Sequence, residues 1–520
     1  LGQEDIVQTG LYGGGIYVGS YSEEVRISGE AEITANSGAS QGGGVHIAGS
    51  GKGFFLEGGR IFENSVDVNN LESHGGGIYC STVTTISDGE IYGNTAKYDG
   101  GGAKLGTVTM TGGKIYGNTC GRDGGGVRSG AFTMSDAAVI CENTSSNSGG
   151  GIYSSAFTME EGAEIYGNKS RSNGGGIAVD GFVTINGGVI YDNTASQGGG
   201  IFNWRGFRIT GGSIHGNTAS GRGGGIATDY GYRCYMTGGS IRDNRSAASG
   251  GGISIYRGCL EMSGGEVTGN KSTAGSGGGI YAYSIWNVWR GECGGERLKI
   301  SGTAKITGNT AGNSGGGVGA EWGSVTISGG EITGNTALGT GTNTGYGGGV
   351  CAFSSVTKFE VMGGIIKDNS ARRKGTDIYG TCAYRYDGNV YKERMEIAVC
   401  AANEMGGGSS DSYWMDENGT GADRVLTGSI DNGEFLKEIH VITKEDGTKG
   451  EDGASQKLSE TYAYTFYEKQ EGIAQVDEVL YPSVQAAVTA LENSEEKAAD
   501  KVITMLKDNR ETVVIPAGVT

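Results

Sequence analysis

The chain has 520 residues, of which 106 are Gly and two are Pro, and it carries a formal net charge of −18. The glycines are periodic but follow no Gly-X-Y pattern, so the composition excludes a collagen helix and makes disorder the weaker interpretation. No run of 18 apolar residues is present, which argues against a membrane-spanning helix. The negative charge argues against nucleic acid as a partner.

Two marks repeat along the first 380 residues. Thirteen GGG triplets, the first at Gly13 and the last at Gly347, lie 24 to 38 residues apart. After each triplet comes an Asn that stands three residues behind an Ile or Val. These are Asn36, Asn64, Asn94, Asn118, Asn143, Asn168, Asn193, Asn217, Asn244, Asn270, Asn309, Asn335 and Asn369. A fixed period of this length is typical of solenoids, whose units bury their apolar faces only by stacking.

Within each repeat the apolar residues alternate with period two, as strands require. In the copy at residues 149–173, Ile152, Phe157, Met159 and Ile165 share the inward face. The pattern predicts three short strands per repeat, of three to five residues each, and no helix. We therefore expect an all-β, right-handed parallel β-helix of about 13 coils over residues 1–380, forming a monomeric rod with coils ~4.8 Å apart.

The two repeated marks suit the corners of such a coil. Asn tolerates a left-handed backbone, and its amide can bond to the Asn of the next coil in a buried ladder. Burial argues against glycosylation at the N-x-S matches that begin at four of these Asn, namely Asn143, Asn168, Asn244 and Asn270. The triplet supplies positive φ and close backbone approach at another tight corner.

The paired motif GGG[IV] and [IV]xxN resembles the GGA[ILV]/FxxN repeats of the chlamydial polymorphic outer-membrane proteins and of related bacterial β-helix surface proteins. The resemblance covers residues 10–380. This chain has Gly in place of Ala in the first motif, and Ile or Val in place of Phe in the second. The resemblance implies a non-catalytic adhesin or stalk, extracellular or on the surface of a bacterium, with no cofactor.

Coils 8 to 12, counted by their triplets, differ most from the others. They carry aromatic and Arg residues in the turn after the GGG[IV] strand, where earlier coils have small residues, and coil 11 contains a long insertion. Because equivalent turns stack, we expect one edge that binds a host protein or glycan. Its residues are Trp204, Arg205, Tyr230, Tyr232, Arg233, Tyr256, Arg257, Tyr283, Trp286, Trp289, Arg290 and Trp322. The alternative is that the insertion merely packs its Trp residues on the rod.

Two further columns are predicted on outward faces. One contains Phe62, Tyr92, Tyr116, Cys141, Tyr166, Tyr191 and His215, which either stabilise the stack by aromatic packing or bind a sugar or protein. The other contains Thr109, Thr133, Thr158 and Thr184, and Arg208 interrupts it in the next coil. That Thr face is too short for an ice-binding surface.

The pectate-lyase-like β-helix also carries polysaccharide lyases and hydrolases, so an enzyme is the alternative function; a passive spacer is a third. Candidate acids do not stack: Asp192, Asp243 and Asp368 come from non-adjacent coils, and the coil with Trp204 separates Asp180 from Asp229. No acid is recognised near a His. We expect no catalytic residue. Nine Cys without a CxxC pair, and only four His, predict neither a zinc site nor a disulfide framework. Most Cys are interpreted as small apolar fillers.

The repeat ends with the corner at Gly375, whose triplet is lost. Residues 381–470 are predicted to form irregular final coils and a cap, with a strand in 462–470. Residues 471–520 are predicted to be a linker, an amphipathic helix and strands. This last part resembles the helical cap and first coil of a second, truncated β-helix, as in large surface proteins. The missing initiator Met and the predicted strand at the last residues suggest a piece of a longer protein.

Overall fold

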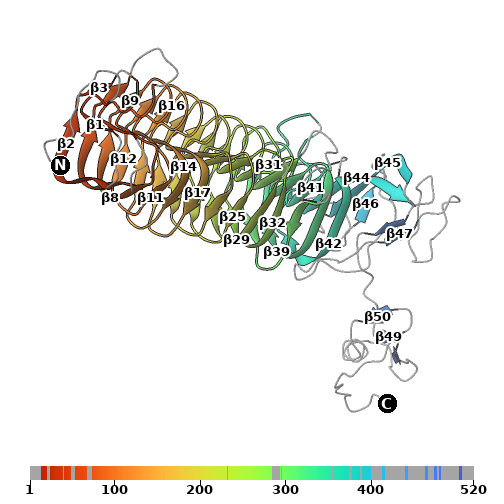
Figure 1. Ribbon diagram of the computed structural model, residues 1–520. Coiled ribbons are helices and arrows are strands. Elements are labelled where there is room, and N and C mark those ends of the chain that lie inside the picture. The colour runs from red at the N-terminus through yellow and green to blue at the C-terminus, as the bar shows by residue number, and fades with distance from the viewer. Residues whose placement is uncertain are drawn as a thin grey trace.

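Parallel strands stacked along one axis form most of the molecule (Figure 1). The computed structural model describes residues 13–19, 24–38, 40–48, 53–66, 73–230, 232–283, 293, 296–342, 344–353, 356–373, 377–386 and 389–399, with six short strands after residue 412. These residues form strands and turns and no helix. One sheet has 33 strands and a second has 13. The predicted right-handed parallel β-helix is therefore confirmed.

In each coil, the triplet is followed by a first, a second and a third strand. Separate first strands are β1 Ile16–Val18, β4 Val45–Ile47, β7 Ile78–Cys80, β10 Ala103–Leu105, β20 Ile177–Val179, β24 Ile201–Asn203, β28 Ile226–Thr228, β31 Ile253–Tyr256, β34 Ile280–Tyr283, β38 Val318–Ala320, β41 Val350–Ala352 and β44 Ile378–Tyr386. In β14 Val127–Met134 and β17 Ile152–Met159, the first strand continues into the second.

Separate second strands are β11 Val108–Met110, β21 Val183–Ile185, β25 Phe207–Ile209 and β35 Glu296–Ile300. Separate third strands are β12 Lys114–Tyr116, β15 Val139–Cys141, β18 Glu164–Tyr166, β22 Val189–Tyr191, β26 Ser213–His215 and β36 Lys305–Thr307. The second and third strands are continuous in β2 Glu24–Thr34, β5 Gly53–Phe62, β8 Thr84–Tyr92, β29 Arg233–Arg242, β32 Cys259–Thr268, β39 Gly323–Thr333 and β42 Val356–Lys367.

A fourth strand of two residues follows the ladder Asn, and the sequence did not predict it. These corner strands are β3 Ser37–Gly38, β6 Ser65–Val66, β9 Thr95–Ala96, β13 Thr119–Cys120, β16 Thr144–Ser145, β19 Lys169–Ser170, β23 Thr194–Ala195, β27 Thr218–Ala219, β30 Arg245–Ser246, β33 Lys271–Ser272, β37 Thr310–Ala311, β40 Thr336–Ala337 and β43 Ser370–Ala371. Two residues are too few for period-two alternation to reveal a strand. From the first of these 13 strands to the last, the chain makes about twelve full turns.

The parallel stack continues past the last triplet. β44 pairs in parallel with β41, with Ile378 beside Val350, whereas the corner predicted at Gly375 lies outside the described residues. β44 then pairs antiparallel with β45 (Asn389–Val399), and β45 with β46 (Tyr413–Met415).

The remaining described strands form two small antiparallel sheets. They are β47 His440–Ile442, β48 Ala463–Thr465, β49 Ala474–Val476, β50 Val479–Tyr481 and β51 Ile503–Met505. β48 lies within the strand predicted at 462–470. The predicted helix after residue 482 lies outside the described residues, and the boundaries at 380 and 470 stay predictions.

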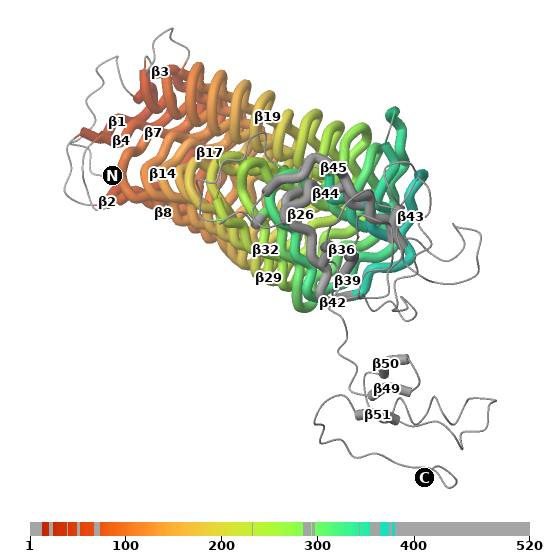
Figure 2. Tube along the Cα trace, turned by 90° about the vertical axis from the view of Figure 1, so that its right-hand side faces the viewer, coloured from red at the N-terminus to blue at the C-terminus, as the bar shows by residue number. Residues whose placement is uncertain are grey.

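The apolar core runs inside the coils along the rod. Figure 2 shows the path of the coils from a second direction. Ile152, Phe157, Met159 and Ile165 are each at most 1% exposed, as predicted. Equivalent residues face one another across coils, since Phe157 is in register with Val183. Each coil therefore buries its apolar face only against its neighbours, and the chain must repeat to fold.

The asparagine ladder is confirmed. Asn168, which is fully buried, donates from Nδ2 to Asn193 Oδ1 at 3.0 Å and also to the carbonyls of Ile140 and Tyr166. The same Asn-to-Asn bond recurs in twelve consecutive steps from Asn36 to Asn369, at 2.9–3.0 Å. The ladder thus satisfies polar groups that the corner would otherwise bury unpaired.

The left-handed residue at this corner is the one before the Asn, and not the Asn as the sequence suggested. Ala35, Glu63, Glu142, Asp192, Asp243 and Asp368 have φ of 53–57° there, and other coils have Gly. The preceding residue makes the bend, which leaves the Asn side chain aligned along the axis. At the triplet, the prediction holds: Gly149 has φ of 66°, and a Cβ on Gly150 would lie 2.3 Å from the Gly175 carbonyl oxygen.

Candidate functional site

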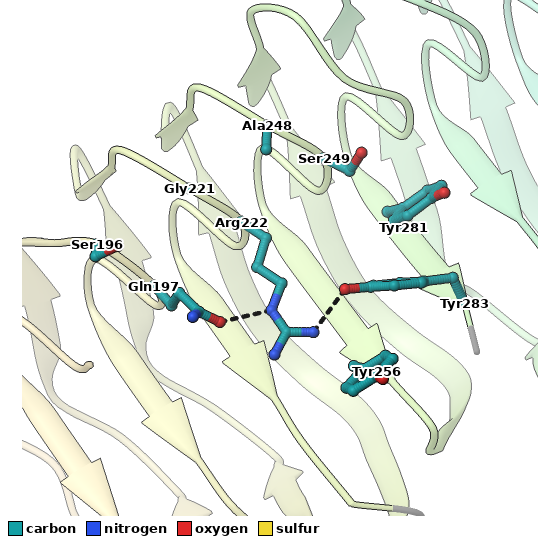
Figure 3. A pocket seen from close by; sticks show the side chains of 9 residues that line it. All are labelled: Ser196, Gln197, Gly221, Arg222, Ala248, Ser249, Tyr256, Tyr281 and Tyr283. Atoms are coloured by element: carbon teal, nitrogen blue, oxygen red, sulfur yellow. Dashed lines mark hydrogen bonds between the residues drawn. The ribbon is translucent and has the colours of Figure 1, made fainter. Parts of the chain in front are cut away.

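Arg222 lies at the centre of an open groove on the outer surface of coils 7 to 11 (Figure 3). It immediately precedes the triplet of coil 9, which leads into the first strand of that coil, β28. The groove has a volume of about 610 Å³ and is lined by Ser196, Gln197, Gly221, Arg222, Ala248, Ser249, Tyr256, Tyr281 and Tyr283. Stacking thus brings together residues that are far apart in sequence.

The Arg222 guanidinium is held by contacts on several sides. Its Nε donates to Gln197 Oε1 at 2.7 Å, and its Nη1 donates to the Tyr283 hydroxyl at 2.7 Å. Its Cζ lies 4.7 Å from the centroid of the Tyr256 ring, and its Nη2 lies 3.6 Å from Asp229 Oδ2. Only 15% of its side chain is exposed, so the groove has a fixed cationic centre.

These bonds leave two further donors among the residues that line the groove. Because Arg only donates, the Tyr283 hydroxyl accepts from Arg222 and retains its own proton for an acceptor. The same logic assigns Oε1 of Gln197 as the atom facing Arg222, which leaves the amide NH₂ as a donor. Burial raises the pKa of Tyr283, so that hydroxyl stays protonated at neutral pH.

Three tyrosine rings form one wall of the groove. The ring centroids of Tyr256 and Tyr283 are 4.9 Å apart, as are those of Tyr281 and Tyr283. The buried Tyr281 hydroxyl donates to Glu321 Oε1, and burial together with that carboxylate raises the pKa of Tyr281. The wall combines apolar ring faces with fixed hydroxyls, which suits a ligand with both kinds of surface.

The structure brings some of the predicted edge residues together. Tyr256 and Tyr283 are in contact in the groove, and the Arg257 guanidinium lies 4.7 Å from the Tyr256 ring centroid. The Arg205 guanidinium lies 5.4 Å from the ring centroid of Tyr232.

The other predicted residues have more varied surroundings. Trp204 packs on Phe202, with centroids 4.6 Å apart, and Arg233 forms an ion pair with Glu261 at 3.1 Å. Tyr230 is 54% exposed. The backbone carbonyl of Trp322 accepts from Arg297 Nε at 3.1 Å. Trp286, Trp289 and Arg290 lie outside the described residues, so their part in the edge stays a prediction.

Three residues of this edge have a strained backbone. Tyr230, Arg257 and Trp322 have φ of 60°, 60° and 61°, in the turn after the first strand of coils 9, 10 and 12. Bulky side chains rarely adopt this left-handed conformation, which costs about 1–2 kcal/mol each. Such strain clusters at functional sites in proteins. It therefore supports a function at this turn.

Sequence reasoning missed Arg222, Gln197 and Tyr281. The predicted edge consists of residues in the turn after the first strand, whereas Arg222 and Gln197 lie in the corner before the triplet. A signal was available, because Arg222 is the only Arg immediately before any of the triplets. Tyr281 is hidden in the regular alternation of its strand.

A second polar cluster corrects the expectation that no acid lies near a His. Asp99 and His74 both precede a triplet in adjacent coils, and the Asp99 N–H donates to His74 Nδ1 at 3.3 Å. Arg122 donates to both Asp99 oxygens, at 2.8 and 2.7 Å, and Lys104 Nζ lies 3.8 Å away. Burial would raise the pKa of Asp99, but the Arg122 bonds outweigh it and lower that pKa. Burial, with the nearby cations, lowers the pKa of His74 to about 4.

The aromatic column packs as predicted. Ring centroids are 4.8 Å apart for Phe62 with Tyr92 and for Tyr166 with Tyr191, and 5.3 Å for Tyr191 with His215. The buried Cys141 interrupts the stack. The Thr column is also in register, and Arg208 follows Thr184 in it.

The cysteines behave partly as predicted. Cys80, Cys120, Cys141, Cys234 and Cys351 are free and buried, as fillers should be. Cys259 and Cys293 form a disulfide that the odd Cys count did not predict, with Cα atoms 5.8 Å apart. It joins the second strand of coil 10 to the end of the insertion in coil 11.

No family model matches this chain, and no curated protein or solved structure matches it. Within the described residues, no cluster of three His, Cys, Asp or Glu side chains could hold a metal ion. The same residues include no helix that is long and apolar enough to cross a bilayer. The groove is therefore interpreted from its own geometry.

Proposed function

We propose that this chain is a non-catalytic segment of an exported bacterial surface protein that binds a glycan through the groove around Arg222. The observation that carries the proposal is the tyrosine wall of Tyr256 and Tyr283 beside donors fixed by Arg222. Sugars present apolar faces for the rings and oxygen acceptors for the donors. A concave site of about 610 Å³ also falls in the range of ligand pockets, which favours a glycan over a flat protein partner.

Two observations support export. The Cys259–Cys293 disulfide is the kind of bond that persists in oxidising compartments. The repeat motif resembles those of bacterial surface proteins of the polymorphic outer-membrane type. A host glycan is accordingly the proposed ligand. All the residues that line the groove belong to one chain, so a monomeric rod could bind it.

A glycan array tests the groove. Tyr283→Phe keeps the ring but removes the hydroxyl that accepts from Arg222, whereas Tyr256→Ala removes one face of the wall. We expect Tyr256→Ala to weaken binding about tenfold or more, because aromatic contacts dominate such sites. Tyr17→Phe is the matched control, since it removes a Tyr hydroxyl from the first strand of coil 1 instead.

Unchanged binding by both groove variants would contradict the site. Replacing Trp286 and Trp289 with Ala measures separately what the insertion contributes. If the wild-type chain binds no glycan and releases no product, the passive spacer is the better account.

One observation favours the alternative, a polysaccharide lyase or hydrolase. Asp99 and Asp123 come from adjacent coils, and Arg122 lies 2.7 Å from the first and 3.5 Å from the second. Burial raises the pKa of Asp123, whereas the pKa of Asp99 is lowered, and carboxyls with opposite shifts suit acid and base roles. Product release from pectin- or mucin-type polysaccharides, abolished by Asp123→Asn, would establish this function instead.

A further inference from the structure

The part of the chain around the groove is basic although the whole chain is acidic. Residues 201–305 contain twelve Lys and Arg against six Asp and Glu, a net charge of +6. With a total of −18, the rest of the chain carries −24. Positive charge is thus concentrated in coils 8 to 11, where a field of that sign attracts anions.

Besides Arg222, three arginines in this region are stacked on tyrosine rings. Arg205 lies 5.4 Å from the Tyr232 ring centroid, and Arg208 lies 4.8 Å from that of Tyr235. Arg257 lies 4.7 Å from that of Tyr256, which also forms the groove wall. We call Arg205, Arg208 and Arg257 the arginine edge.

Within the described part of the chain, the arginine edge lacks counter-charges. Among the residues that the structure describes, none of its three guanidiniums has a carboxylate within 4 Å, whereas Arg233 has Glu261. The Nε of Arg257 is buried and has no hydrogen-bond partner there. A guanidinium fork matches the paired oxygens of a carboxylate or sulfate.

We infer that the ligand of the groove is an anionic glycan, whose carboxylate or sulfate groups bind the arginine edge. This inference rests on the proposed function and specifies its ligand class. The donors of Tyr283 and Gln197 extend the anion-binding surface into the groove. Single-stranded nucleic acid is less favoured, because Arg groups already cover one face of Tyr232, Tyr235 and Tyr256 and leave less ring surface for bases.

Calorimetric titration of the full chain with defined oligosaccharides tests the inference. The probes are oligogalacturonate, its neutral methyl ester, a heparin-type sulfated oligosaccharide and a neutral cello-oligosaccharide. We expect the acid to bind about tenfold tighter than its ester, and this advantage to shrink when NaCl rises from about 50 to about 200 mM.

Paired variants locate the effect. Arg205→Gln with Arg257→Gln should reduce affinity for the acid about tenfold and leave the ester unchanged. Arg245→Gln is the matched control, because this exposed Arg lies in corner strand β30 and belongs neither to the groove lining nor to the arginine edge. Affinity for the carboxylate probe or for the sulfated probe each supports the inference, and their ratio identifies the anion.

Failure of the inference is distinct from failure of the proposed function. Equal affinity for the acid and its ester, or equal loss in the Arg245→Gln control, overturns the anionic ligand but keeps a glycan-binding groove. Binding to none of the four probes contradicts both. Tighter binding to single-stranded nucleic acid than to any glycan overturns the ligand class.

Discussion

Asp377 ends the asparagine ladder by accepting from Asn369. Its Oδ1 accepts the Asn369 Nδ2–H at 2.8 Å and the Asn369 backbone N–H at 3.2 Å. In the preceding step, Asn369 Oδ1 plays the same part for Asn335. An ionised carboxylate accepts hydrogen bonds and has no N–H to donate, so the ladder can end at Asp377 without leaving a donor unpaired.

The cap predicts a local effect of substitution at this end. Asp377→Ala should leave the buried Asn369 backbone N–H without its acceptor and remove one of the three acceptors of Asn369 Nδ2, which costs about 1–3 kcal/mol. Because solenoid stability is a sum over neighbouring repeats, the loss should concentrate in the last coils. Hydrogen exchange should show faster exchange in β43 but not at Asn168. Asp377→Asn keeps an acceptor and should be milder; equal protection in wild type and Asp377→Ala would contradict the capping role.

A ladder residue in mid-rod should matter more. Asn193 is fully buried, donates to Asn217 and Ile165, and accepts from Asn168. Asn193→Ala removes the donors and the acceptor together, so we expect a loss of about 3–5 kcal/mol in the free energy of unfolding. Chemical denaturation measures it. The control is Asn186→Ala, an exposed Asn in the preceding turn of the same coil, which should change stability by no more than about 0.5 kcal/mol.

The repeat made the fold predictable because stacking turns a sequence period into a spatial one. Ile152, Phe157 and Ile165 could be placed in the core, and the Asn in a ladder, from spacing alone. The position of the left-handed residue was not predicted. It is the residue before Asn, and at Glu63 and Asp192 the residue type gives no sign of a positive φ.

The groove was only half predictable. Tyr256 and Tyr283 stand out as aromatic residues in turns that are otherwise small. Arg222 was missed because it lies in the corner before a triplet, whereas the tyrosines that it contacts lie at the ends of first strands in later coils. The repeat period shows which equivalent residues stack, but it does not show which non-equivalent positions of different coils come into contact. The contact between His74 and Asp99, by contrast, could have been read from the period, because both residues precede a triplet in adjacent coils.

Stability should depend on pH through His74. Its pKa is about 4 in the folded protein, against about 6.5 unfolded. Between these values the unfolded state binds more protons, so the free energy of unfolding falls as the pH drops from about 6.5 to about 4. Asp99, whose pKa is lowered, loses its stabilising ionised form only as the pH falls further.

Denaturation at pH 7 and at pH 4.5 measures this dependence. We expect the difference in unfolding free energy between the two to shrink by about 1–2 kcal/mol in His74→Gln. Above pH 7.5 the wild type and the variant should share the same slope. An unchanged difference would show that His74 titrates normally.

The strain at Tyr230 predicts a trade between stability and binding. Tyr230 has φ of 60° and is 54% exposed, so its side chain contributes little packing. Tyr230→Gly should relieve about 1–2 kcal/mol of backbone strain and lose about 0.5–1 kcal/mol through the more flexible unfolded chain. Thermal or chemical unfolding should therefore show a small gain in stability, while the affinity for glycan falls.

Asp136→Gly separates the two effects. Asp136 has φ of 54° but lies at the turn after the second strand of coil 5, away from the edge. It should gain stability in the same way with no change in affinity. If Tyr230→Gly is stabilised and still binds as the wild type does, Tyr230 has no part in the binding edge. If it is destabilised, its side chain is holding the turn through packing, and the left-handed conformation there is not strain retained for binding.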